Sequence, residues 1–77
     1  MSSLSRNLAP GQWVRRVIPP DLVHLGYTHD GEVAVISAYP SGRSVEIRFL
    51  DGYTFNSFVR FLHPIPPEEA AVMVLGQ

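Results

Sequence analysis

The segment 45–65, VEIRFLDGYTFNSFVRFLHPI, constrains the possible fold more than any other part of this chain. Apolar and polar residues alternate before the Asp51-Gly52 pair, and an aromatic-rich run follows it, a pattern typical of two half-buried strands joined by a hairpin. A two-residue turn would mix polar and apolar side chains on both faces, whereas one extra residue with Gly52 in the left-handed region separates them. We therefore expect a three-residue turn, with Phe49 facing Phe55 across the hairpin.

This register gives the hairpin an apolar inner face and a polar outer face. In it, Ile47 faces Ser57 and Val45 faces Val59. The expected inner residues are Val45, Ile47, Phe49, Tyr53, Phe55, Val59 and Phe61. The expected outer residues are Glu46, Arg48, Asn56 and Arg60.

Proline and glycine divide the rest of the chain into further short elements. Residues 13–18 and 32–39 are rich in β-branched and aromatic residues and predict strands, the second of them central or covered because neither of its faces is polar. Residues 19–31 predict a long loop with one helical turn over DLVHL, and a second short turn is expected over FVRF. A C-terminal helix is expected from Pro67 to Leu75, and its last six residues are apolar and must be buried on the sheet or on a partner.

The order of these segments carries a resemblance. WVRRV, GEVAVI, VEIRFLDG and FVRFLHPI follow one another as the strands do in Src-homology-three-like (SH3-like) small barrels of the Tudor or KOW kind, which this chain resembles over about residues 10–65. The resemblance implies a small five-stranded SH3-like barrel, so with the helix expected after it the fold class is mainly β, a barrel followed by a short C-terminal helix. The implied organisation is a flexible arm at 1–10, the barrel at 11–65 and the helix with its tail at 66–77, within the one domain that 77 residues allow.

Two functional branches of this fold can be compared with the residues. Tudor modules that read methylated side chains use an aromatic cage, and Tyr27, Tyr39, Tyr53 and Phe55 are the rings available here, without a recognisable cage spacing. The small plasmid-borne dihydrofolate reductases line a tetrameric pore with a V-Q-I-Y strand. The nearest match here is VEIRF, which has a glutamate and an arginine in place of the glutamine and tyrosine, so that activity is not expected.

Residue content argues against most catalytic and metal sites. The chain has no cysteine, and His24, His29 and His63 lack the spacing of metal ligands, so no metal and no cofactor are expected. No nucleophile-elbow, phosphate-loop or dinucleotide motif is present, and we do not expect an enzyme. The lone tryptophan, Trp13, is expected either in the core or as an anchor for a partner.

The most concentrated polar feature is the outer hairpin face. We expect binding through Arg48, Arg60 and Asn56, with Arg43 nearby and with Phe58 and Leu50 as apolar anchors, because arginine and aromatic residues together form interface hot spots. We expect a non-enzymatic protein-interaction module, a small accessory or regulatory factor of bacterial or phage origin that binds an acidic protein surface. The alternatives are nucleic-acid or ribonucleoprotein binding through the same arginines and, third, an oligomeric small-barrel enzyme.

Charge and hydropathy bound the partners and the location. A net charge of −1 disfavours a general nucleic-acid binder. With 45% hydrophobic and only 17% charged residues, apolar surface is expected to serve self-association or binding. The candidate homo-oligomer contact is Val72, Met73, Val74 and Leu75. No apolar run is long enough to span a membrane and the N-terminal residues lack the apolar centre of a secretory signal, so we expect a cytoplasmic protein without membrane contact.

Overall fold

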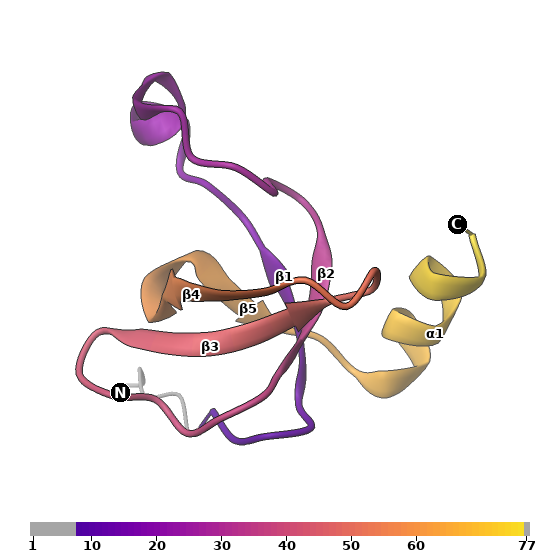
Figure 1. Ribbon diagram of the computed structural model, residues 1–77. Helices are drawn as coiled ribbons and strands as arrows, with labels where there is room; N and C mark the ends of the chain where they lie inside the picture. The colour runs from indigo at the N-terminus through magenta and orange to yellow at the C-terminus, as the bar shows by residue number, and fades with distance from the viewer. Residues whose placement is uncertain (1–7, 77) are drawn as a thin grey trace.

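The computed structural model describes residues 8–76, which form an antiparallel sheet and one short C-terminal helix, the mainly β fold that the sequence predicts (Figure 1). The strands are β1 (Trp13–Arg16), β2 (Val33–Ile36), β3 (Ser44–Phe49), β4 (Thr54–Phe58) and β5 (Leu62–Pro64). Two 3-10 helices, η1 (Pro20–Leu25) and η2 (Val59–Phe61), and the helix α1 (Pro67–Leu75) complete the fold.

The five strands lie in the order β4-β3-β2-β1-β5, with antiparallel pairing throughout. β2 pairs with β1 and β3, as its apolar faces indicate. β4 and β5 are the edges of the sheet and are joined by η2, so the sheet is not closed into a barrel and the predicted barrel is not confirmed.

The hairpin between β3 and β4 has the expected three-residue turn but not the expected pairing. Gly52 has φ 93°, and the amides of Phe49 and Gly52 bond to the carbonyls of Tyr53 and Phe49, each at 2.9 Å. Ile47 therefore pairs with Phe55, so the predicted pairing of Phe49 with Phe55 is wrong by two residues. A two-residue shift leaves Val45, Ile47 and Phe55 on the predicted inner face and Glu46, Arg48 and Asn56 on the predicted outer face, because strand side chains alternate with a period of two.

The apolar core lies on the inner face of β1, β2 and β3. Its buried cluster consists of Leu8, Val14, Ala34, Ile36, Val45, Ile47, Phe49 and Leu62, with Phe55 and Val59 packed against it. Tyr53, predicted inside, is 52% exposed because it lies beyond the end of the β4 ladder, next to the turn. Leu8 falls within the predicted arm, yet it is buried, while residues 1–7 lie outside the described part of the chain.

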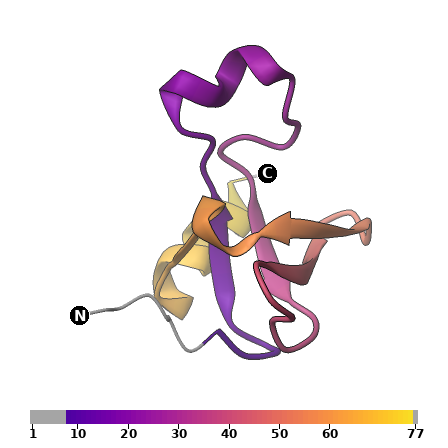
Figure 2. The same cartoon turned by 90° about the vertical axis from the view of Figure 1, so that its left-hand side faces the viewer.

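The two predicted strands before the hairpin are shorter than expected. β1 ends at Arg16: the amide of Val17 still donates to the carbonyl of Phe61, in register with the Arg16–Leu62 pair, but the amide of Ile18 donates to the carboxylate of Asp30 and not to a strand. The chain then projects from the sheet as the long β1–β2 loop, with η1 at its tip (Figures 1 and 2). No residue of η1 is buried.

α1 begins and ends at the predicted residues and packs against β1 and β2. Ala70 is fully buried, and Met73 and Val74 are half-buried. Val72 and Leu75 point away from the sheet and are 71% and 87% exposed. The predicted burial of the apolar run therefore holds for one side of the helix only.

Candidate interaction surface

Two groups of rings lie along β4 and η2 with the Arg16 guanidinium between them, and we call them together the aromatic row. On one side the rings come from β3, β4, η2 and the turn before β4, and on the other side from residues 27–29 of the β1–β2 loop. The row consists of Tyr53, Phe49, His29, Phe55, Phe61, Tyr27 and Phe58.

The hairpin end of the row is built around His29. Its ring stacks on Phe49 with centroids 4.2 Å apart and an interplanar angle of 22°, and it lies 5.6 Å from Tyr53 and 6.0 Å from Phe55. His29 is the one non-glycine residue of the described chain with a positive φ, at 64°, a conformation uncommon outside glycine. Its Nδ1 lies 3.1 Å from a carboxylate oxygen of Glu32, an ion pair only when the imidazole is protonated.

The other end of the row lies at η2. Tyr27 meets the ring of Phe61 edge-on at 5.1 Å and that of Phe58 at 6.4 Å, while Phe58 and Phe61 are 5.4 Å apart. Such edge-to-face pairs contribute ~0.5–1.5 kcal/mol each beyond the burial of area. The guanidinium carbon of Arg60 lies 5.4 Å from the Phe61 centroid, so this end of the row carries an exposed cation.

Arg16 lies between the two ends of the aromatic row and contacts a ring of each. Its side chain is only 1% exposed, and the guanidinium carbon lies 4.9 Å from the Phe55 centroid and 5.3 Å from that of Phe61. Nε donates to the carbonyl of Thr28 at 2.9 Å, and Nη1 donates to the hydroxyl of Ser57. Arg16 therefore links the β1–β2 loop to β4, a strand that does not pair with β1.

The electrostatics of Arg16 follow from this position. Burial lowers the pKa of its guanidinium below the ordinary value, and the nearby side chains of Tyr27 and Asp30 oppose that shift. An arginine side chain stays protonated in proteins, so the loop is held by a buried cation. The rings of Phe55 and Phe61 and the two hydrogen bonds offset part of its desolvation.

The row is exposed at its ends. Tyr53 is 52% and Phe58 43% exposed, and Tyr27, His29 and Phe55 between them are half-buried. Neither Arg16 nor His29 was predicted to belong to a binding site. In Trp13-Val14-Arg15-Arg16 alternation places Arg16 on the same face as Val14, but each face carries one apolar residue and one arginine, so the sequence does not show that this face is the inner one.

The predicted outer-face site is divided by the structure. Arg48 and Asn56 are exposed on β3 and β4, and Leu50 is 43% exposed in the turn that follows β3. Arg43 and Arg60 lie at the opposite end of the hairpin, where the carbonyl of Arg43 accepts a 2.8 Å bond from the amide of Val59. Arg43 and Arg48 are five positions apart along the extended chain, which corresponds to roughly 17 Å.

Phe58 therefore has a different setting from the one expected. It contacts Tyr27 and Phe61 in the aromatic row, close to Arg60 and Arg43, and not Arg48. Three of the six predicted site residues, Arg43, Phe58 and Arg60, thus gather at the η2 end of the row. Arg48, Asn56 and Leu50 remain on a separate face.

Other kinds of site find little support. Across residues 8–76, no three His, Cys, Asp or Glu side chains are grouped so that they could hold a metal ion. None of the described helices has the length and apolar character needed to cross a membrane. Comparison of the chain with protein-family models, curated proteins and solved structures finds no match in any of the three.

Proposed function

We propose that this protein is a non-enzymatic protein-interaction module that binds a segment of a partner through the aromatic row. The observation that carries this proposal is the pair of exposed rings, Tyr53 and Phe58, at the ends of a row that Arg16 fixes in place. Aromatic and arginine side chains dominate interface hot spots, and a surface that is ordered before binding loses less entropy on association. The fold is proposed to be an open variant of the SH3-like barrel that the sequence resembles, with η2 joining the two edge strands.

The charge at the η2 end indicates which chemistry the partner presents there. Arg43 and Arg60 are exposed beside Phe58, and no carboxylate of the described chain forms an ion pair with either of them. An acidic side chain of the partner next to an apolar one would match this end of the row. The proposed partner surface is therefore acidic where it meets η2.

Selection from a random dodecapeptide library displayed on phage tests the proposal. Peptides enriched on the immobilised wild-type protein are synthesised and their affinities measured for the wild type, for Phe58→Ala and for Tyr53→Ala. We expect each substitution to weaken binding at least ~10-fold, the range of an interface hot spot. The matched control is Arg48→Ala, which removes an exposed side chain from the separate outer face and is expected to leave affinity unchanged.

The opposite outcome would locate the binding surface elsewhere. If the enriched peptides bind Phe58→Ala and Tyr53→Ala as tightly as the wild type, the aromatic row is not the binding surface. If Arg48→Ala or Asn56→Ala weakens them instead, the outer hairpin face is the binding surface.

Nucleic-acid binding is a second candidate, favoured by the position of Arg43 and Arg60 beside the exposed ring of Phe58. Single-stranded binders combine cations that contact phosphates with rings on which bases stack. A fluorescent 16-nucleotide single strand, titrated at several salt concentrations, tests this function. Arg60→Ala should lower the slope of log affinity against log salt by about 0.7, and absence of retention at low salt would exclude it.

A further inference from the structure

The free edge of β4 carries backbone groups that no strand pairs. Along an antiparallel ladder, hydrogen-bonded pairs alternate with non-bonded pairs, and residues of the non-bonded pairs direct their N–H and C=O groups away from the neighbouring strand. The amide of Phe49 bonds to the carbonyl of Tyr53. Two and four positions further along this register, Phe55 and Ser57 also bond to β3. The residues of β4 that face outward are Thr54, Asn56 and Phe58.

These outward groups are available to another chain. β4 lies at the margin of the sheet with a strand on one side only (Figure 1), and Thr54, Asn56 and Phe58 are exposed. Within residues 8–76, their amides form no hydrogen bond, and neither do the carbonyls of Thr54 and Asn56. The carbonyl of Phe58 accepts a 3.1 Å bond from the hydroxyl of Ser57. The edge thus presents unpaired groups at every second residue, a pattern that the backbone of an extended chain matches.

The opposite edge of the sheet, β5, is blocked. His63 pairs with Arg15 and turns its backbone groups toward β1. Of the two residues that face outward, Leu62 bonds through its amide to the carbonyl of Val59, and Pro64 has no N–H group. These described residues of β5 therefore offer no amide donor to another strand.

β4 lacks the features that usually protect a free edge. Sheet edges are commonly shielded by charged side chains, proline, bulges or a covering element, because their free backbone groups pair with other chains. β4 reads Thr-Phe-Asn-Ser-Phe, without charge or proline, and its register with β3 is unbroken. The described part of the β1–β2 loop contacts β4 through the rings of Tyr27 and His29, without a hydrogen bond to this edge. One edge of the sheet is thus blocked, and the other is open to strand addition.

We infer that the partner's segment binds as an added β-strand along β4. Its backbone exchanges hydrogen bonds with Thr54, Asn56 and Phe58. Its side chains opposite Phe55 and Ser57 lie on the inner face of the sheet, along the aromatic row. The segment is therefore extended, has an apolar side chain at every second residue and has no proline where its amides bond to β4. The inference rests on the proposed function in taking the ligand to be a segment of a partner, and it adds the conformation of that segment.

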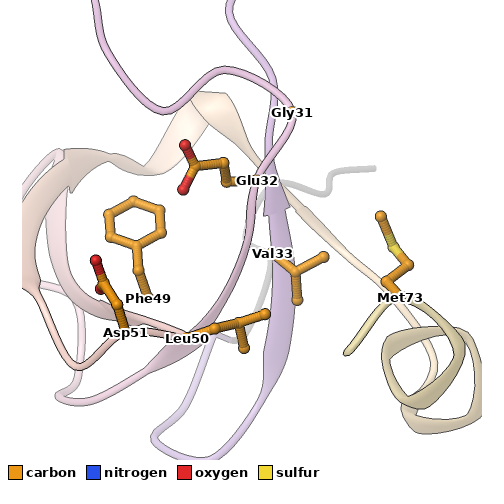
Figure 3. A pocket seen from close by; sticks show the side chains of 7 residues that line it. All are labelled: Gly31, Glu32, Val33, Phe49, Leu50, Asp51 and Met73. Carbon is orange, nitrogen blue, oxygen red and sulfur yellow. The ribbon is translucent and has the colours of Figure 1, made fainter. Parts of the chain in front are cut away.

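The charges at the two ends of β4 indicate which end of the segment is acidic. At the hairpin end, Figure 3 shows the carboxylates of Glu32 and Asp51 on either side of the Phe49 ring, where both line a cavity of about 480 Å³. At the other end, Arg43 and Arg60 are exposed beside η2. An acidic residue of the segment is repelled at the hairpin and attracted at η2.

A second copy of this chain fits the edge less well than a single segment does. Antiparallel pairing of two β4 strands places the inner faces of both sheets on the same side, because the two-fold axis is then perpendicular to the joined sheet. The β1–β2 loop projects from the sheet, and its residues 27–29 lie over the rings of β4 (Figures 1 and 2). The loops of two copies would approach each other across the new strand pair, whereas a single segment brings no such loop.

Amide hydrogen exchange of the ¹⁵N-labelled full chain tests the pairing directly. Saturation with the tightest-binding library dodecapeptide should slow exchange at Asn56 and Phe58 at least ~10-fold, because their outward amides become hydrogen-bonded. Both amides should also shift, whereas Arg48, which pairs with Val35 of β2, should not. Unchanged exchange at Asn56 and Phe58 in the bound state would overturn the inference, and joint shifts at Arg48 and Asn56 would indicate the outer hairpin face instead.

N-methylation of the same peptide, one residue at a time, tests the spacing of its bonds. Each methyl group removes one amide donor. An added strand predicts a loss of affinity of at least ~10-fold at the two positions that bond to the carbonyls of Thr54 and Asn56, and of less than ~2-fold at the residue between them. Equal losses at consecutive positions would contradict strand addition.

Asn56→Pro tests the edge from the side of the protein. The substitution removes an outward amide and leaves the ladder with β3 intact, because residue 56 does not bond to β3. Affinity for the dodecapeptide should fall at least ~10-fold. Asn56→Ala keeps the amide, and if it weakens binding as much as Asn56→Pro does, the side chain is recognised and strand addition is refuted. If Asn56→Pro does not fold, the N-methyl scan decides.

Further results separate this inference from the proposed function. If peptides depend on Phe58 and Tyr53 but respond neither to N-methylation nor to Asn56→Pro, strand addition fails and the interaction module stands. If they show the two-residue pattern but bind Phe58→Ala and Tyr53→Ala as tightly as the wild type, the aromatic row fails as the binding surface and the β4 edge stands. If the wild type sediments as a dimer that Asn56→Pro converts to a monomer, a second copy occupies the edge and the partner segment is contradicted. A library without any peptide that depends on the row or the edge contradicts both.

Discussion

The inner face of the sheet has two halves that are closed in different ways. Where β1, β2 and β3 lie side by side, the face is covered by apolar side chains such as Val14, Ile36 and Ile47, each at most 1% exposed. Along β4 and η2 the same face is covered by a loop, by partly exposed rings and by the buried cation of Arg16. One half is an ordinary hydrophobic core, and the other contains charge, hydrogen bonds and exposed aromatic area.

The difference supports the proposal that the apolar half serves the fold and the aromatic half serves recognition. A core that only has to be stable does not require a desolvated guanidinium. Burying a charge costs on the order of several kcal/mol before ion pairs and hydrogen bonds offset the cost. A binding surface benefits from rings whose positions are fixed and whose edges stay accessible. The aromatic half has both properties, and the substitutions below should affect the stability and the binding of the two halves differently.

The largest effect is expected in the apolar half. Ile47→Ala removes a fully buried side chain from the centre of the sheet and should lower the free energy of unfolding by ~2–5 kcal/mol. Urea denaturation measures the change. If the alanine variant does not fold, Ile47→Val, which should lower the free energy of unfolding by ~0.5–1.5 kcal/mol, is measured in its place. A decrease in the free energy of unfolding below about 0.5 kcal/mol for both variants would contradict the assignment of Ile47 to the core.

Arg16→Met tests the aromatic half. It keeps a long side chain but leaves the carbonyl of Thr28 and the hydroxyl of Ser57 without their donor, at an expected cost of ~1–3 kcal/mol. Hydrogen exchange should rise at Tyr27, Thr28 and His29 while protection of the core strands is retained. Arg15→Met is the matched control, since Arg15 is exposed on the same strand, and it should change neither quantity much. Uniform loss of protection would mean that Arg16 supports the whole sheet and not the loop.

Phe58→Ala should affect binding more than folding. The ring is 43% exposed, so its removal should cost only about 1 kcal/mol or somewhat more in thermal or urea unfolding. Affinity for library peptides should nevertheless fall at least ~10-fold. A destabilisation above roughly 3 kcal/mol would place Phe58 with the core and weaken the contrast between the halves.

The smallest stability effects are expected on surfaces outside both halves. Arg48→Ala and Leu75→Glu alter exposed side chains and should each change the free energy of unfolding by no more than ~0.5 kcal/mol. Self-association through α1 is proposed to involve Val72 and Leu75, the residues that face away from the sheet. Sedimentation equilibrium should then show a mass shift toward the monomer for Leu75→Glu, and an unchanged mass would exclude this contact.

Short sequence patterns correctly predicted three features of the fold. The Asp51-Gly52 turn, the central β2 and the bounds of α1 follow from residues close together in sequence. The hairpin pairing was missed by two residues because alternation has a period of two and is satisfied equally by either register. The end of β1 was missed because the amide of Ile18 donates to the side chain of Asp30, 12 residues away in sequence.

The candidate site depended on contacts that no local pattern encodes. Arg16 meets Thr28 and Ser57, which are 12 and 41 residues away in sequence, and His29 reaches Phe49 from the loop. The pair Arg15-Arg16 looks the same on both faces of a strand until its neighbours are known. Phe58 and Arg60 were predicted as binding residues, and whether they bind stays a prediction, now tied to the aromatic row.

An NMR map of one selected peptide on the ¹⁵N-labelled full chain tests directly whether the aromatic row is the binding surface. We expect the largest amide shifts at Tyr27, His29, Tyr53 and Phe58, with little change at the apolar core. Largest shifts at Arg48 and Asn56, or at Val72 and Leu75, would contradict it, because the peptide would then occupy the outer hairpin face or α1 instead of the aromatic row.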